Sequence, residues 1–154
     1  MSLGTAALWL HVLAGVGWIG LCGSCVLASI ALDGAATESQ EFSARALPRL
    51  NRLSIGCACI IALTGVINLI FAARAHGYAL PKEFIAIVGV KLLLFATMAG
   101  ALAIAIGRSH AMRLSSADAP SETGAALRGI APWYGSIVVL GAVALVLGLW
   151  LAGM

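Results

Sequence analysis

The stretch of sequence that decides the fold runs from Phe84 to Ile106 and reads FIAIVGVKLLLFATMAGALAIAI. Its one charged side chain is Lys91, and the other residues are apolar, small or a threonine. A helix of about 20 such residues is long enough to cross the hydrocarbon core of a bilayer. No alternating pattern indicates a β-barrel, and backbone groups in lipid must be satisfied within their own segment, so this stretch is predicted to be a transmembrane helix.

Three further stretches have the same character, at about residues 5–32, 53–73 and 133–152. Composition agrees with them, since 62% of the 154 residues are hydrophobic and 10% are charged, against about 25% charged residues in a soluble domain. We therefore predict one domain over residues 1–154, an all-α integral membrane protein surrounded by a lipid bilayer. Its four helices are expected to form an antiparallel bundle in which consecutive helices are neighbours.

Basic residues in the connecting loops predict the orientation of the chain. The first and third loops contain Arg45, Arg49, Arg52, Arg108, Arg113 and Arg128. The middle loop contains only Arg74 and Lys82. Because loops rich in Lys and Arg stay in the cytoplasm, both termini are predicted on the opposite side. The expected aromatic belt consists of Trp9 and Trp150 at the outer interface and Trp133 and Tyr134 at the inner one. The arginines lie in short loops rather than on a basic face with aromatic platforms, so no nucleic acid partner is expected.

Polar residues within the spans gather on one face of each helix. Positions three, four, seven and eleven apart share a face of an α-helix. Such stripes hold His11, Gly15, Trp18, Cys22, Cys25 and Ser29 on the first span, Ser54, Cys57, Thr64 and Asn68 on the second, and Lys91, Phe95 and Met98 on the third. Since a polar group is costly in hydrocarbon, these faces are predicted to point into the bundle.

Depth along the helices predicts a polar site in the outer half of the bundle. His11 and Lys91 lie at similar depths, roughly 10 Å below the outer ends of their helices at 1.5 Å per residue. Asn68 lies near the outer end of its helix, and His76 lies in the loop above it. We expect these four side chains and Trp18 to form a cofactor-binding site. The simpler alternatives are a histidine bonded to a carbonyl, a lysine that extends to the headgroups and an ordinary loop histidine.

Three cysteines are predicted to gather at the inner end of the bundle. Cys22 and Cys25 share a face of the first helix, and Cys57 lies at a similar depth on the second. Three thiolates are a suitable set of ligands for a soft ion such as Cu(I). The more ordinary alternative is packing, because buried cysteine behaves mainly as a small apolar side chain.

Small residues form rows along two of the spans. The rows are Ala144, Gly148 and Ala152 on the fourth span and Ala96, Gly100 and Ala103 on the third. Such rows let helices approach closely. They are therefore candidates for seating a flat cofactor or for contact with a partner membrane subunit or a second copy of the chain.

Four short motifs run through the spans. They are Leu10-His11 followed by Trp18-Ile19-Gly20, the stretch Arg49–Leu53 leading to Leu63–Asn68, the run Val90–Phe95, and the pair Leu127-Arg128. Together they resemble the membrane domain of the copper-resistance D (CopD) family. HemJ-type protoporphyrinogen oxidases share that four-helix plan, with a first-helix histidine, a third-helix lysine and a bound haem b. His11 and Lys91 match those two positions, whereas the stretch Leu21–Leu27 departs from the HemJ pattern, which has a Pro-Arg-containing segment there.

This resemblance implies a small haem b protein in membrane electron transfer or haem/tetrapyrrole chemistry, and any enzymatic activity is expected to be that of an oxidoreductase. His11 is the expected axial ligand, Lys91 the expected partner of a propionate, and His76 a candidate second ligand. Copper handling through His11 and the cysteines is one alternative, and a cofactor-free accessory subunit of a larger membrane complex is another. We expect the protein in a bacterial inner membrane, with periplasmic termini and cytoplasmic first and third loops.

Overall fold

The computed structural model describes residues 3–115 and 123–152, and this part of the chain contains helices and no strand. Its long helices are α1 (Leu3–Ala31), α3 (Leu47–Ala75), α4 (Lys82–Ser115) and α5 (Thr123–Ala152). Between α1 and α3 lie the short helix α2 (Ala36–Glu41) and a π-helical turn, η1 (Phe42–Ala46). Each of the four long helices is long and apolar enough to cross a membrane. The fold class is therefore confirmed as an all-α four-helix bundle of an integral membrane protein.

Three helices extend beyond the predicted spans at the end of the bundle that carries α2, which we call the α2 end. The helix α3 begins at Leu47, α4 reaches Ser115 and α5 begins at Thr123, whereas hydropathy placed these boundaries near 53, 106 and 133. Hydropathy marks only the part of a helix that lies in hydrocarbon. Pro48 occupies the first turn of α3, a position where its missing N–H costs nothing. Most of the predicted first and third loops is thus helical.

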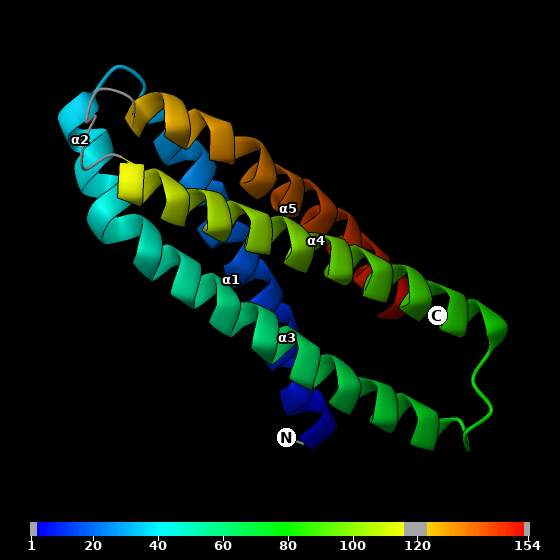
Figure 1. Ribbon diagram of the computed structural model, residues 1–154. Coiled ribbons are helices and arrows are strands. Elements are labelled where there is room, and N and C mark those ends of the chain that lie inside the picture. Colours follow the sequence, from blue (N-terminus) through cyan, green and yellow to red (C-terminus); the bar gives the residue numbers. More distant parts are fainter. Residues whose placement is uncertain (1–2, 116–122, 153–154) are drawn as a thin grey trace.

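The helices follow one another around the bundle in the order α3, α1, α5, α4 (Figure 1). The helix α1 packs against both α3 and α5, and α5 also packs against α4. In contrast, α3 and α4 make few contacts although they are consecutive in the chain. The expectation that consecutive helices are neighbours is therefore wrong for this pair, and the bundle is loosely closed along what we call the α3/α4 seam.

Side chains are buried mainly between the middle of the bundle and the α2 end. The largest fully buried side chains there include Trp18, Tyr134 and Ile137. Trp18 meets Phe95 of α4 edge to face, with the ring centroids 5.8 Å apart. Toward the opposite end, which carries both chain termini and which we call the terminal end, α3 contributes only Thr64 to the fully buried set. The terminal half is therefore the more loosely packed half of the molecule.

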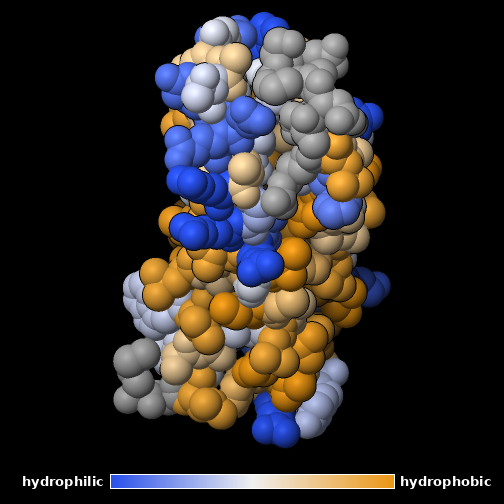
Figure 2. Space-filling view, turned by 60° about the vertical axis from the view of Figure 1, so that its left-hand side comes forward, coloured by the Kyte–Doolittle hydropathy of each residue, from blue (hydrophilic) through white to orange (hydrophobic). Residues whose placement is uncertain are grey.

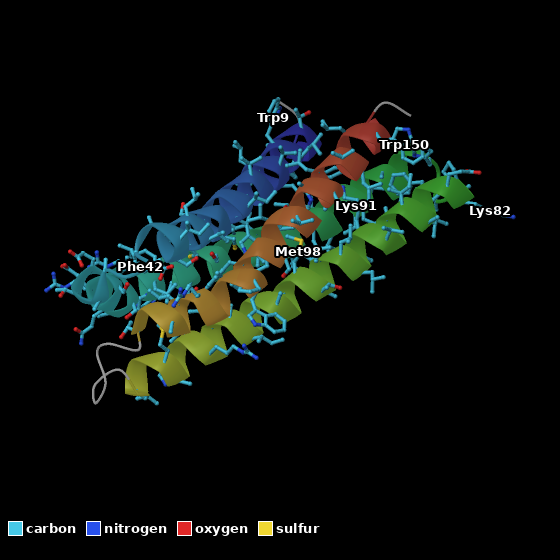
Figure 3. All side chains as sticks on the ribbon, turned by 90° about the horizontal axis from the view of Figure 1, so that it is seen from above. Trp9, Phe42, Lys82, Lys91, Met98 and Trp150 are labelled. Atoms are coloured by element: carbon cyan, nitrogen blue, oxygen red, sulfur yellow. The ribbon has the colours of Figure 1, made fainter. Side chains whose placement is uncertain are left out.

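The outer surface suits a bilayer. Figure 2 shows apolar side chains over the middle and lower part of one face, with hydrophilic residues gathered at the upper, α2 end. Trp9 and Trp150 lie at the terminal end, far from Phe42 at the α2 end (Figure 3), and both are exposed. Their positions suit an aromatic belt at one membrane interface.

Tyr134 does not belong to such a belt. It is 1% exposed, because it lies on the inward face of α5 together with the buried residues Leu127, Ile130 and Ile137. Trp133 is half-buried and lies beneath the guanidinium of Arg108, 5.3 Å from the ring centroid. The inner aromatic pair predicted from the sequence is thus divided between the core and the surface.

Candidate functional site

The inward face of α1 supplies the centre of the candidate site. Its fully buried residues include Trp18, Cys22, Cys25 and Ser29, and His11 is half-buried on the same stripe. These are the positions that helical periodicity places on one face. The remaining faces of α1 carry large apolar side chains that are exposed and suited to lipid.

His11 is held by a hydrogen bond to the neighbouring helix. Its Nδ1 lies 2.9 Å from Oγ1 of Thr64 on α3. The Thr64 hydroxyl in turn donates to the carbonyl oxygen of Ile60, at 2.6 Å. Since the single hydroxyl proton is used there, Thr64 accepts from His11, and we assign the Nδ1–H tautomer. The other ring nitrogen, Nε2, then presents a lone pair for a ligand.

The imidazole packs against α3 beside Gly65. A Cβ at Gly65 would lie 3.4 Å from Cε1 of His11. This is ordinary van der Waals contact, so the ring packs against α3 next to Thr64. Thr64 thus fixes both the position and the tautomer of the histidine.

Lys91 lies inside the same half of the bundle. It is half-buried, and a Cβ at Gly148 of α5 would lie 3.1 Å from its Nζ. Figure 3 places it between the middle of the bundle, where Met98 lies, and the terminal end. The histidine of α1 and the lysine of α4 therefore both lie in the terminal half of the bundle.

Lys91 has no carboxylate partner within the described part of the chain. The ion pairs found there are Arg45–Glu41 and Arg128–Asp33, and both lie at the α2 end. The nearest acidic residue along its own helix is Glu83, about 12 Å away at 1.5 Å per residue. An ammonium held in this position without a counter-ion favours binding of an anionic group.

Two other predicted site residues lie less centrally. Asn68 is half-buried on α3, one turn beyond Thr64 toward the terminal end. His76 is exposed, and its Nδ1 lies 3.0 Å from the carbonyl oxygen of Ala72 in its own helix. It stands twelve residues beyond Thr64, or about 18 Å along the helix. The structure therefore does not bring His76 to His11, and the two cannot bind one iron from opposite sides.

The cysteines lie nearer the α2 end than His11. Cys22 and Cys25 are buried, Cys57 is half-buried and Cys59 is exposed. Among the described residues, no three His, Cys, Asp or Glu side chains are grouped so that they could hold a metal ion. Ser54 of α3 lies within hydrogen-bonding reach of the Cys22 thiol. This contact agrees with the packing alternative for the cysteines.

Sequence reasoning missed a buried hydrogen-bond network near these cysteines. The Tyr134 hydroxyl donates to Oδ1 of Asn51 at 2.6 Å. The Asn51 amide donates to Oγ of Ser109 at 3.3 Å, and Ser109 donates to the carbonyl oxygen of Ile106. This network joins α5, α3 and α4, and it ties the α3/α4 seam at the α2 end. Asn51 lies outside the predicted span, so the only sequence signal was its place one turn before Ser54.

Trp18 adds an unpaired donor to the interior. Its Nε1 is fully buried and has no hydrogen-bond partner among the residues that the structure describes. A buried N–H without an acceptor is costly. Trp18 lies seven residues from His11 on the same face of α1, about 10 Å along the helix axis. Its ring packs edge to face on Phe95, on the side of the His11–Lys91 region that faces the α2 end.

Comparisons with family models, with curated proteins and with solved structures found no match to this chain. The fold and the site define a small four-helix integral membrane protein whose more loosely packed half holds a histidine and a lysine, the lysine without a counter-ion among the described residues.

Proposed function

We propose that the chain is a small haem b-binding membrane protein of the CopD/HemJ type, acting in electron transfer or haem/tetrapyrrole chemistry. The observation that carries this proposal is the state of His11. Its Nδ1–H is fixed on Thr64, which leaves Nε2 free to bind iron. An imidazole that donates its second N–H to an acceptor of the protein is the usual arrangement of an axial ligand.

Lys91 supports the same function through charge. Haem b carries two propionates, and the ammonium of Lys91 has no counter-ion among the described residues. Binding would therefore pair an isolated cation with a carboxylate, which relieves the cost of holding the cation in a membrane. A small free metal ion gains nothing from a neighbouring ammonium.

The packing of the helices also suits a flat ligand. The α3/α4 seam makes few contacts, so a macrocycle can part these helices without breaking an extensive interface. Bound haem b would supply one-electron redox chemistry. The chain itself would bind the iron through His11, neutralise a propionate through Lys91 and keep water out through Trp18 and Phe95.

The other functions considered from the sequence have less support. Copper handling needs a set of soft ligands, and the described residues contain no group of three suitable side chains. A cofactor-free accessory subunit gives no reason for a lysine within the bundle that has no counter-ion in the described part of the chain. We propose a bacterial inner membrane as the location, with periplasmic termini.

The test is the absorption spectrum of the purified protein, before and after addition of haem b. A Soret band is expected in the wild type and is expected to be lost or strongly shifted in His11→Ala. His110→Ala is the matched control, because His110 is exposed near the α2 end of α4. A spectrum unchanged by His11→Ala would remove His11 from the iron, and a protein that binds no haem would overturn the proposal.

A further inference from the structure

A groove separate from the His11–Lys91 region lies between α1 and α5 at the α2 end. It has a volume of about 390 Å³. Val26, Ile30 and Asp33 line it from the α1 side, and Arg128, Pro132 and Gly135 line it from α5. The groove is thus formed where two membrane-spanning helices leave the bilayer.

The groove is polar at one end and apolar along the rest. Because α1 and α5 run in opposite directions, Asp33 is level with Arg128, and Val26 is level with Gly135. Seven residues separate Arg128 from Gly135 on α5, so the apolar end lies about 10 Å further into the membrane. This is the arrangement of a lipid, with a headgroup at the membrane surface and a hydrocarbon chain below it.

The polar end carries one cation and one anion side by side. Nη1 of Arg128 lies 3.0 Å from Oδ2 of Asp33. Both side chains are about half exposed, at 57% and 50%, so each can accept a second partner. A phosphate suits the guanidinium, which has further N–H donors. An ammonium suits the carboxylate. A zwitterionic headgroup therefore matches this pair, whereas a purely anionic headgroup meets the repulsion of Asp33.

Pro132 adds an acceptor at the same place. It lies inside α5 and has no N–H to donate to the carbonyl oxygen four residues earlier, which is that of Arg128. This carbonyl oxygen therefore lacks its usual backbone donor and can accept a hydrogen bond from a ligand in the groove. A primary ammonium has N–H groups to offer it, whereas the quaternary ammonium of choline has none.

From these observations we propose that the α1/α5 groove binds a phospholipid whose headgroup carries a phosphate and a primary ammonium, that is, a phosphatidylethanolamine. The phosphate lies on Arg128, the ammonium lies on Asp33 and on the Arg128 carbonyl, and one acyl chain follows Val26 and Ile30 toward Gly135. The site is independent of the proposed haem site.

The test measures retained lipid. Protein reconstituted in an equimolar mixture of phosphatidylethanolamine, phosphatidylcholine and phosphatidylglycerol is extracted in mild detergent, and the lipids that stay bound are counted by native mass spectrometry. Phosphatidylethanolamine is expected to exceed each of the other two by about tenfold, the ratio that one charge-assisted hydrogen bond supports. Equal retention of the three lipids would overturn the proposal, and so would a preference for phosphatidylglycerol.

Two variants locate the site. Gly135→Leu fills the groove, and it is tolerated by the helix because a Cβ at Gly135 meets nothing within 4 Å. Its matched control is Gly129→Leu on the same helix, where a Cβ also meets nothing and which does not line the groove. Retention of phosphatidylethanolamine should fall in Gly135→Leu and persist in Gly129→Leu.

Asp33→Asn tests the headgroup without filling the groove. It should weaken the discrimination between phosphatidylethanolamine and phosphatidylcholine, because the ammonium keeps only the Arg128 carbonyl as a partner. Arg45→Gln is the control, because it removes the other ion pair, Arg45–Glu41. A preference that survives both Gly135→Leu and Asp33→Asn would contradict the assignment of the groove.

Discussion

Thr64 controls which nitrogen of His11 is available to a ligand. Its hydroxyl donates to Ile60 and accepts from Nδ1 of the histidine, so the ring cannot present Nδ1 to a metal without losing this bond. The sequence stripe placed Thr64 on the inward face of its helix. It did not reveal the contact with His11, because a shared face does not specify which residues of two helices stand at the same level.

Thr64→Val tests this role, since valine keeps the shape of threonine and removes the acceptor. The free energy of haem binding should become less favourable by about 1–3 kcal/mol, the cost of leaving a buried N–H unpaired. Titration with haem b measures the change. Thr64→Ser restores the acceptor and should restore the affinity. Equal affinities in Thr64→Val and the wild type would show that this hydrogen bond does not prepare His11 for iron.

Lys91→Met is expected to act in opposite directions on the free and the bound protein. Without ligand, the variant loses a cation that has no counter-ion among the described residues, so its Tm in detergent should rise. With ligand, it loses the partner of a propionate, and haem binding should weaken about tenfold, or ~1.4 kcal/mol.

Lys82→Met is the matched control, because Lys82 is exposed at the start of the same helix. It should change neither quantity. A Lys91→Met protein that binds haem as tightly as the wild type would exclude Lys91 from the site.

At the scale of the helices, periodicity and hydropathy predicted the secondary structure and one of the inward faces. They gave the long helices and the inward face of α1, because a transmembrane helix has one face for protein and another for lipid. They could not give the order of packing. The few contacts between α3 and α4 depend on how side chains far apart in the chain pack, which the pattern of each helix alone does not specify. Similarly, the pairing of Asn51 with Tyr134 joins residues 83 positions apart in the chain.

Gly141 is predicted to set the distance between α1 and α5. A Cβ there would lie 2.7 Å from Cγ1 of Ile19 and 3.2 Å from Cε of Met98. Gly141→Val should therefore destabilise the bundle by about 1–3 kcal/mol through overpacking. Thermal unfolding in detergent measures the loss. Ile19→Ala in the same chain makes room and should recover part of it.

The control for this interface is Gly100→Val on α4, where a Cβ meets nothing within 4 Å. Gly100 is exposed, and the substitution should leave the Tm nearly unchanged. If Gly141→Val proves as stable as Gly100→Val, the close approach of α1 and α5 at Gly141 does not limit the packing.

At the scale of the whole molecule, charge is distributed unevenly between the two ends. Exposed arginines at the α2 end are Arg45, Arg49, Arg52, Arg108 and Arg128. The terminal end carries Arg74 and Lys82. The extension of α3, α4 and α5 beyond the hydrocarbon places these arginines on rigid helix ends near the headgroups, where basic residues bias the orientation most strongly.

The two ends are therefore expected to face different compartments, with the α2 end in the cytoplasm. Alkaline phosphatase fused after Ala152 should be active, because this enzyme needs an oxidising compartment to form its disulfides. A phosphatase inserted between Glu38 and Ser39 should be inactive.

A triple variant tests the role of charge. It should move part of the population to the opposite orientation when it combines three added lysines before Leu3 with Arg45→Gln, Arg49→Gln and Arg52→Gln. Arg74→Gln with Lys82→Gln removes charge from the other end and should leave the C-terminal fusion fully active. The opposite pattern of phosphatase activity would place the His11–Lys91 region toward the cytoplasmic leaflet, where a ligand would have to reach it from inside the cell.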